Sequence, residues 1–197
     1  LLAVGGYGRS ELFPYSDIDI LILLDDARST DPELQSNLES FIALCWDSGL
    51  EIGSAVRTLS ECLSEAQHDI TVRTSVLEAR LLGGHRGLFK LFKRSFDEAM
   101  DPKTFFQAKL LEQQQRHYKY QETPYALEPN CKESPGGLRD LQIILWVSKA
   151  ASLGNSYTDL FKRGLITERE LKELNRNQKL LQNIRANLHL LAKRRQD

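Results

Sequence analysis

Short apolar runs alternate with helix-like segments over the first hundred residues. Residues 1–4 and 18–24 are almost wholly apolar, and such continuous runs are typical of strands that are buried on both faces. A glycine pair at residues 5–6 separates them, followed by a segment over 7–12 with the pattern of a short helix. The N-terminal segment therefore predicts two neighbouring buried strands.

Two capping boxes mark the helices that follow. Residues 30–33, TDPE, combine a capping box with a proline in the first turn, and they predict a helix over 32–48. Residues 50–57 return to a strand pattern, and a second capping box, TLSE at 58–61, begins another helix. We expect a fourth strand over 75–82, which ends at a further glycine pair.

The pattern becomes mainly helical after residue 102. An irregular polar stretch over 123–137 precedes a helix over 138–153, and a capping box at 167–170 opens a last helix with leucines at helical spacing. The predicted fold class is therefore α/β (α+β), a mixed sheet with helices followed by an all-helical domain. We expect domains over 1–100 and 101–197.

Composition excludes several classes of protein. The 41% hydrophobic content fits a globular protein with real cores, and no apolar run approaches the roughly 18 residues that span a bilayer. Cys45, Cys62 and Cys131 lack the spacing of a zinc site, so we expect free thiols and a cytoplasmic location. The basic run at 193–195 fits the C-terminus of a helix, and neither nucleic acid nor membrane is expected as a partner. Because the chain begins inside an apolar strand without methionine, we expect it to be part of a longer protein.

The segment at 16–19, SDID, carries the clearest chemical signal. Successive side chains of a strand point to opposite faces, so Asp17 and Asp19 should project to the same side. Two adjacent carboxylates repel one another unless a cation compensates their charge. Mg²⁺ is typically held by one or two carboxylates together with substrate phosphates, which predicts a site for a nucleoside triphosphate.

Two separate motifs resemble a known family. The block VGGYGRSELFPYSDIDILILL at 4–24 resembles the signature of the nucleotidyltransferase superfamily typified by DNA polymerase beta. It is most similar to the uridylyltransferase/uridylyl-removing enzymes of PII nitrogen signalling. The block EPNCKESPGGLRDLQIILW at 128–146 resembles a hallmark segment of the same family, and LEIGSAVRTLSECL and LEARLLGG fit the stretch between.

The resemblance implies roles for residues at the first motif. Gly5 and Gly6 would hold the triphosphate with help from Ser16, and Asp17 and Asp19 would bind Mg²⁺.

Two further assignments at this motif each have an alternative. Glu78 is the preferred third catalytic carboxylate, as metal ligand or base, and Glu51 is its competitor. Arg9 would bind a phosphate or form a surface pair with Glu11.

The second motif is expected to fold back on the catalytic face. In the family context Lys132, Arg139 and Asp140 are candidates for contacting the nucleotide or for stabilising the contact between domains. Lys132 and Arg139 supply positive charge, whereas Asp140 suits the base or the ribose.

The implied reaction transfers UMP from UTP to a tyrosine hydroxyl of a PII-type signalling protein and releases pyrophosphate. The alternatives are a nucleotide sensor without catalysis and adenylyl transfer to a protein or a small molecule. The family also carries a hydrolase domain named for a His-Asp pair, but His68-Asp69 is interpreted as a helix-start or loop dipeptide. The uridylyl-removing activity is therefore expected to be missing from this chain.

Overall fold

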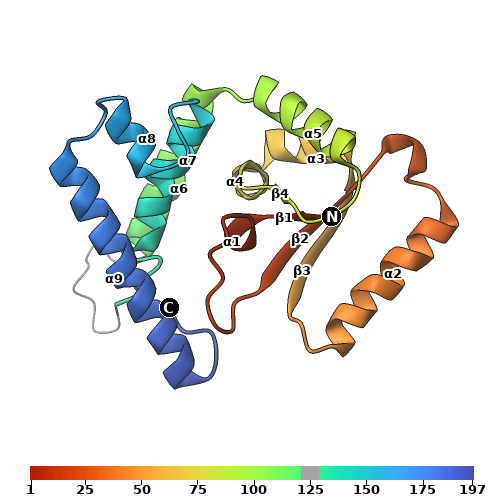
Figure 1. Cartoon of the computed structure of the whole chain (residues 1–197), viewed down its shortest axis with the longest axis horizontal. Coiled ribbons are helices and arrows are strands. Elements are labelled where there is room, and N and C mark those ends of the chain that lie inside the picture. The colour runs from red at the N-terminus through yellow and green to blue at the C-terminus, as the bar shows by residue number, and fades with distance from the viewer. Residues whose placement is uncertain (121–128) are drawn as a thin grey trace. The chain divides into compact units, whose positions relative to one another are not determined.

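A computed structural model describes residues 1–120 and 129–197, and its first part is built on one mixed sheet (Figure 1). The strands are β1 (Leu2–Ala3), β2 (Ile18–Leu24), β3 (Ile52–Thr58) and β4 (Arg80–Leu81). Their order is β3-β2-β1-β4, with β2 and β3 parallel and β1 antiparallel to both of its neighbours. The apolar centre of β2 is buried, as its continuous apolar pattern predicts.

Helices surround this sheet and complete the first unit. They are α1 (Gly5–Gly8), the 3-10 turn η1 (Asp26–Arg28), α2 (Pro32–Asp47), α3 (Leu59–His68), α4 (Ile70–Leu77) and α5 (Arg86–Glu98). The helix α2 lies beside β3, and α3 and α4 pack on one another (Figure 1). The core contains strand residues together with Cys62, Val76, Phe92 and Phe96.

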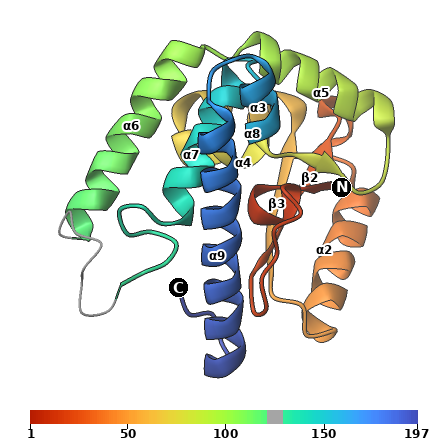
Figure 2. The same cartoon turned by 60° about the vertical axis from the view of Figure 1, so that its left-hand side comes forward.

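The second unit is helical in the residues described. It contains α6 (Pro102–Lys119), α7 (Leu138–Ala150), α8 (Tyr157–Lys162) and the long α9 (Glu168–Ala192), which Figure 2 shows in blue along its whole length. Trp146 of α7 and Phe105 of α6 are buried in its core. The mixed α/β fold followed by helices is therefore confirmed, while part of the predicted irregular stretch, at 121–128, lies outside the described residues.

Two local predictions are wrong. The segment expected as a strand over 75–82 is the end of α4, a turn and the two-residue β4. The side chain of Asp69 accepts hydrogen bonds from the backbone N–H groups of Thr71 and Val72, and this cap begins a helix that continues through the β-branched run. The helix expected over 7–12 is instead α1, which begins at the glycine pair itself.

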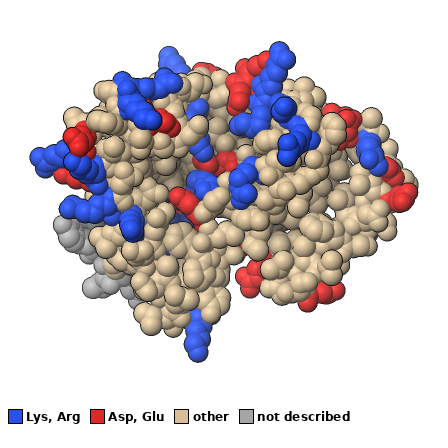
Figure 3. Space-filling model, viewed as in Figure 1, with Lys and Arg blue, Asp and Glu red and all other residues tan. Residues whose placement is uncertain are grey.

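The chain divides into two compact units. The first contains Leu1–Leu12 and Ser16–Ala99, and the second contains Phe13–Tyr15 and Met100–Asp197. Figure 3 shows charged side chains of both signs on the outer helices, with acidic groups near both ends of α2. Within the described residues, no helix has the length and apolar character required to cross a membrane.

Candidate functional site

The two aspartates of the SDID segment lie at the start of β2. Asp17 directly precedes the strand and is exposed, whereas Asp19 is its second residue and is half-buried. The backbone N–H of Ile18, between them, donates to the carbonyl of Glu51 at 2.9 Å and so continues the parallel pairing with β3. If the extended chain continues one residue before β2, alternation would place the carboxylate of Asp17 on the same face as that of Asp19, and this common face stays a prediction.

The carboxylate of Asp19 lies between two glycines. A Cβ atom added at Gly5 would be 3.2 Å from Asp19 Oδ2, and one added at Gly53 would be 2.7 Å from Asp19 Oδ1. Gly53 is the partner of Asp19 in the β2–β3 register. Gly5 also has a φ of +55°, a conformation that favours glycine. Both backbones therefore leave space that the carboxylate fills.

The helix α1 fixes the position of the glycine pair. Its first turn is closed by the N–H of Gly8, which donates to the carbonyl of Val4 at 2.9 Å. At its other end Arg80 donates to the carbonyl oxygens of Tyr7 and Gly8 at 2.9 and 3.3 Å, and its guanidinium lies over the Tyr7 ring. A Cβ at Gly8 would lie only 2.2 Å from the carbonyl oxygen of Glu78, so α1 packs closely against the end of α4.

A cavity of about 390 Å³ opens beside Asp19. Its walls come from β2, β3, α4 and Val4, which follows β1, and they combine apolar groups with a few polar ones. On β3 the lining residues Gly53 and Ala55 are small, which creates the space, and Arg57 lies farther along the same strand. This volume falls within the range of small-molecule sites.

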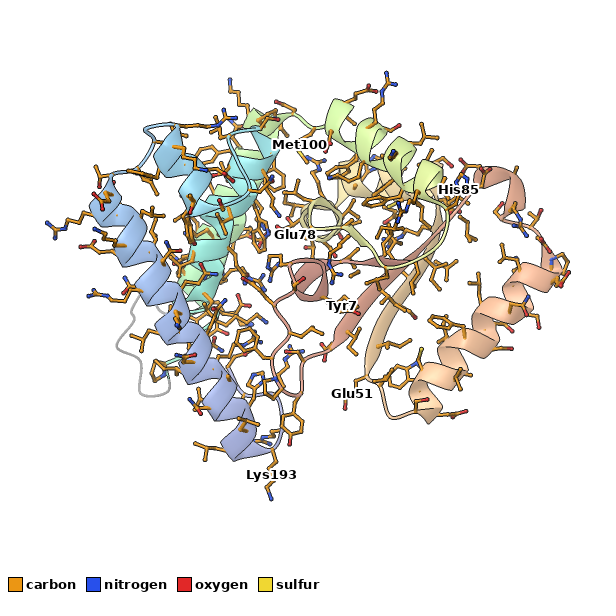
Figure 4. All side chains as sticks on the ribbon, in the orientation of Figure 1. Tyr7, Glu51, Glu78, His85, Met100 and Lys193 are labelled. Carbon is orange, nitrogen blue, oxygen red and sulfur yellow. The ribbon has the colours of Figure 1, made fainter. Side chains whose placement is uncertain are left out.

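The two candidates for a third carboxylate lie in different settings (Figure 4). Glu78 is the C-cap of α4 and is only 4% exposed, so its expected place on a strand is wrong. Glu51 is exposed and directly precedes β3. Because Ile18 pairs with Ile52, the register places Glu51 beside Asp17. No cluster of three or more His, Cys, Asp or Glu suited to a metal occurs within 1–120 and 129–197.

Arg9 and Ser16 lie in the segment that joins α1 to β2. Arg9 Nε donates to Glu11 Oε2 at 2.8 Å, and both side chains are largely buried. This is the ion pair that the sequence offered as an alternative to a phosphate contact. Ser16 is half-buried next to Asp17. The phosphate-binding roles of both residues stay predictions.

The second motif folds into a compact loop before α7. The side-chain oxygen of Asn130 accepts from the backbone N–H groups of Lys132 and Glu133 at 3.0 and 2.7 Å. Gly136 has a φ of +78°, and a Cβ at Gly137 would lie within 3.0 Å of three carbonyl oxygens. These glycines therefore allow a tight turn that bulkier residues would block.

Asp140 joins this loop to α6. Its carboxylate accepts from Gln113 Nε2 at 2.9 Å and from the backbone N–H of Gly136 at 2.7 Å, and it pairs with Arg116 and His117. Burial alone would raise the pKa of Asp140, but the hydrogen bonds from Arg116 and Gln113 hold that pKa below its ordinary value. The described contacts of Asp140 are thus structural, and its contact with a nucleotide stays a prediction.

Lys132 and Arg139 also have partners within the second unit. Arg139 pairs with Glu133 at 3.0 Å, and its guanidinium lies 5.3 Å from the centre of the Trp146 ring. Lys132 Nζ lies 3.5 Å from carboxylate oxygens of both Glu133 and Asp197. Their proposed contacts with the nucleotide also stay predictions.

Sequence reasoning missed Gly53 and the polar residues of the cavity. The signal for Gly53 is present, because a glycine inside a strand suggests close approach of another group. The sequence does not show which group approaches Gly53, because its position beside Asp19 depends on the β2–β3 register. Ser75 was assigned to a strand, whereas in α4 it lines the cavity with Thr71 one turn away.

The donor set fits a divalent cation. Asp17 and Asp19 offer hard carboxylate oxygens two residues apart, and the glycine backbones beside Asp19 leave that carboxylate room. Two carboxylates would leave further coordination positions on such a cation for water and for phosphate oxygens.

Comparison with known proteins agrees with this geometry. Residues 1–74 match the nucleotidyltransferase domain family, and residues 104–197 match the GlnD PII-uridylyltransferase family. Nucleotidyltransferases generally use a divalent metal.

Similar proteins align along the whole chain. It is 64% identical to bifunctional uridylyltransferase/uridylyl-removing enzymes of Cupriavidus pinatubonensis and Cupriavidus metallidurans, and 59% identical to that of Ralstonia nicotianae. Each alignment covers 100% of this chain but only 22–23% of the relative's length. The chain is therefore similar to the nucleotidyltransferase domain family over residues 1–74 and to the GlnD PII-uridylyltransferase family over residues 104–197.

Proposed function

We propose that this chain transfers UMP from UTP to a tyrosine hydroxyl of a PII-type signalling protein and releases pyrophosphate, with Mg²⁺ as cofactor. The observation that carries the proposal is the Asp19 carboxylate between Gly5 and Gly53, beside a cavity of about 390 Å³. The choice of UTP and of a PII protein rests on the relatives' names, since base choice depends on contacts that the motif does not encode.

The reaction is an in-line displacement at the α-phosphorus. The tyrosine oxygen forms a bond to this phosphorus while the bond to the bridging oxygen of the β-phosphate breaks, and pyrophosphate leaves with the bonding electron pair. The hydroxyl proton needs an acceptor. We assign it to the carboxylate of Glu51, which is exposed and lies beside Asp17 in the register, rather than to the buried Glu78.

Asp17 and Asp19 would hold the cation. Mg²⁺ bound there supplies charge neutralisation for the phosphate oxygens. Gly5 and Gly6 let the backbone approach the triphosphate closely, with Ser16 and Arg9 as further contacts. The cysteines Cys45, Cys62 and Cys131 are free thiols, which supports a reducing, cytoplasmic location.

Intact-mass analysis tests the function. A PII protein is incubated with this chain, Mg²⁺ and either UTP or ATP, and the Asp19→Asn variant serves as control. We expect a uridylyl adduct that requires UTP and disappears in the variant. An adduct formed equally well by Asp19→Asn would contradict the site assignment, and an adenylyl adduct would contradict the choice of base.

A further inference from the structure

The cavity beside Asp19 contains a cationic residue that the proposed reaction has not yet used. Arg57 lines this cavity from β3 and is half-buried. Among the described residues, none forms a hydrogen bond or an ion pair with its guanidinium. A half-buried guanidinium in this situation is suited to an anionic ligand, because its planar fork binds phosphate oxygens in a bidentate manner.

The register places Arg57 in line with the carboxylate site. In the β2–β3 register, Asp19 pairs with Gly53, and Leu23 pairs with Arg57. Because every second residue of a strand faces the same side, Gly53, Ala55 and Arg57 all lie on the face that carries Asp19. The four residue-to-residue steps from Gly53 to Arg57 span about 13 Å of strand. Between them on this face of β3 lies Ala55, whose side chain is a single methyl group. An elongated anion that starts at Asp19 can therefore lie along β3 toward Arg57.

The opposite wall supplies hydroxyl groups. Thr71 and Ser75 are one helical turn apart on α4, and both line the cavity. Ser75 Oγ lies 3.8 Å from the position of a Cβ at Gly5, on the same side as Asp19 Oδ2. Val72 and Val76 complete this wall. The cavity thus has a carboxylate at one end, a guanidinium at the other and hydroxyl groups beside the path between them.

We propose that Arg57 is a substrate-binding residue that contacts the β- and γ-phosphates of the nucleoside triphosphate, the part that leaves as pyrophosphate. This assignment rests on the proposed function and deepens it. A positive charge at that end binds the triphosphate more strongly than the monophosphate. It also stabilises the negative charge that the leaving group gains as its bond to the α-phosphorus breaks.

Asp69 offers a competing structural role for Arg57. The hydrogen bond from the Thr71 backbone is the largest contribution that lowers the pKa of Asp69, and the charge of Arg57 adds a smaller one. If Arg57 served only to support the cap of α4, its loss would act through Asp69. Asn is also a good N-cap, so Asp69→Asn removes the charge and keeps the cap.

Calorimetric titration of the 197-residue chain with UTP, UMP and pyrophosphate, in Ca²⁺ to limit turnover, separates these roles. We expect Arg57→Gln to weaken the binding of UTP and of pyrophosphate at least about tenfold, as is typical for the loss of a charged hydrogen bond. The affinity for UMP should change less than about twofold. Arg57→Lys should reduce the affinity for UTP by a smaller factor and leave the affinity for UMP unchanged. Arg86→Gln, which removes an exposed arginine of α5, is the matched control and should change none of the three.

The outcomes distinguish the two proposals. The role of Arg57 would be overturned if Arg57→Gln lost affinity for UTP and UMP equally, or if its affinity for UTP were unchanged. Either result would leave the proposed function intact. The same selective loss in Asp69→Asn would also overturn it. If Arg57→Gln does not fold by circular dichroism, unchanged UTP affinity in Arg57→Lys overturns the proposal in its place. A wild-type chain that binds no nucleotide would overturn both.

Discussion

Two glycines provide the space around the Asp19 carboxylate. Gly5 and Gly53 approach its carboxylate from opposite sides, and each lacks the Cβ that would compete for this space. The sequence predicts the common face of Asp17 and Asp19, because alternation along a strand is a local property. It does not predict the neighbour of Asp19 on β3, which depends on a pairing between distant segments.

Gly53→Ala tests this packing directly. The new Cβ would lie 2.7 Å from Asp19 Oδ1, so the carboxylate must move. A displacement of this kind at a catalytic group can cost about 100-fold in rate. We expect a loss of at least about tenfold in uridylyl transfer with little change in melting temperature.

Gly83→Ala is the matched control, because a Cβ there meets no atom within 4 Å. It should retain transfer. Equal activities of the two variants would contradict the role given to the space around Asp19.

The charge of Asp140 provides a second test at a single residue. Because its pKa is lowered in the folded state, the stabilisation is complete above the unfolded pKa of about 3.9 and is lost as pH falls through the folded value. Asp140→Asn should lower the free energy of unfolding by about 2–3 kcal/mol at pH 7, since Arg116 loses the closer of its two carboxylate partners. Urea unfolding should show this difference shrinking between pH 4 and pH 3, and a constant difference would contradict the ionic origin.

At the scale of elements, the helix α4 is the main departure from prediction. Short runs rich in β-branched residues do not distinguish a strand from a buried helix, and residues 70–77 contain such a run. The interpretation of His68-Asp69 as a helix-start or loop dipeptide included the relevant possibility, because Asp69 is the N-cap of α4. That helix brings Thr71 and Ser75 to the cavity. Because a strand was predicted over 75–82, these two lining residues were not predicted.

The contact between α1 and α4 predicts a specific weakness. Gly8→Ala would place a Cβ 2.2 Å from the carbonyl oxygen of Glu78, and backbone cannot yield as a flexible side chain does. We expect a loss of about 1–3 kcal/mol in the free energy of unfolding, as for other overpacked sites. Thermal unfolding measures it, with Gly83→Ala again as the reference. A melting temperature equal to that of the wild type would show that α1 does not pack in this way.

At the scale of the whole molecule, the second compact unit combines a short N-terminal segment with the C-terminal half of the chain. Residues 13–15 belong to the second unit, where the Phe13 ring lies 6.1 Å from that of His189 and 4.4 Å from the Arg185 guanidinium. The ring of His189 also hydrogen-bonds the carbonyl of Pro14. Some 175 positions separate these partners, so no local pattern in the sequence could indicate the contact.

Binding of Mn²⁺ in the presence of UTP, followed by electron paramagnetic resonance, tests the central claim most directly. Mn²⁺ accepts the same carboxylate oxygens as Mg²⁺, and the signal does not depend on catalytic turnover. We expect the wild-type chain to bind Mn²⁺ together with UTP, and Asp17→Asn and Asp19→Asn each to weaken this binding at least about tenfold while the fold is retained. Unchanged binding of Mn²⁺ in both variants would contradict the assignment of Asp17 and Asp19 as the metal site.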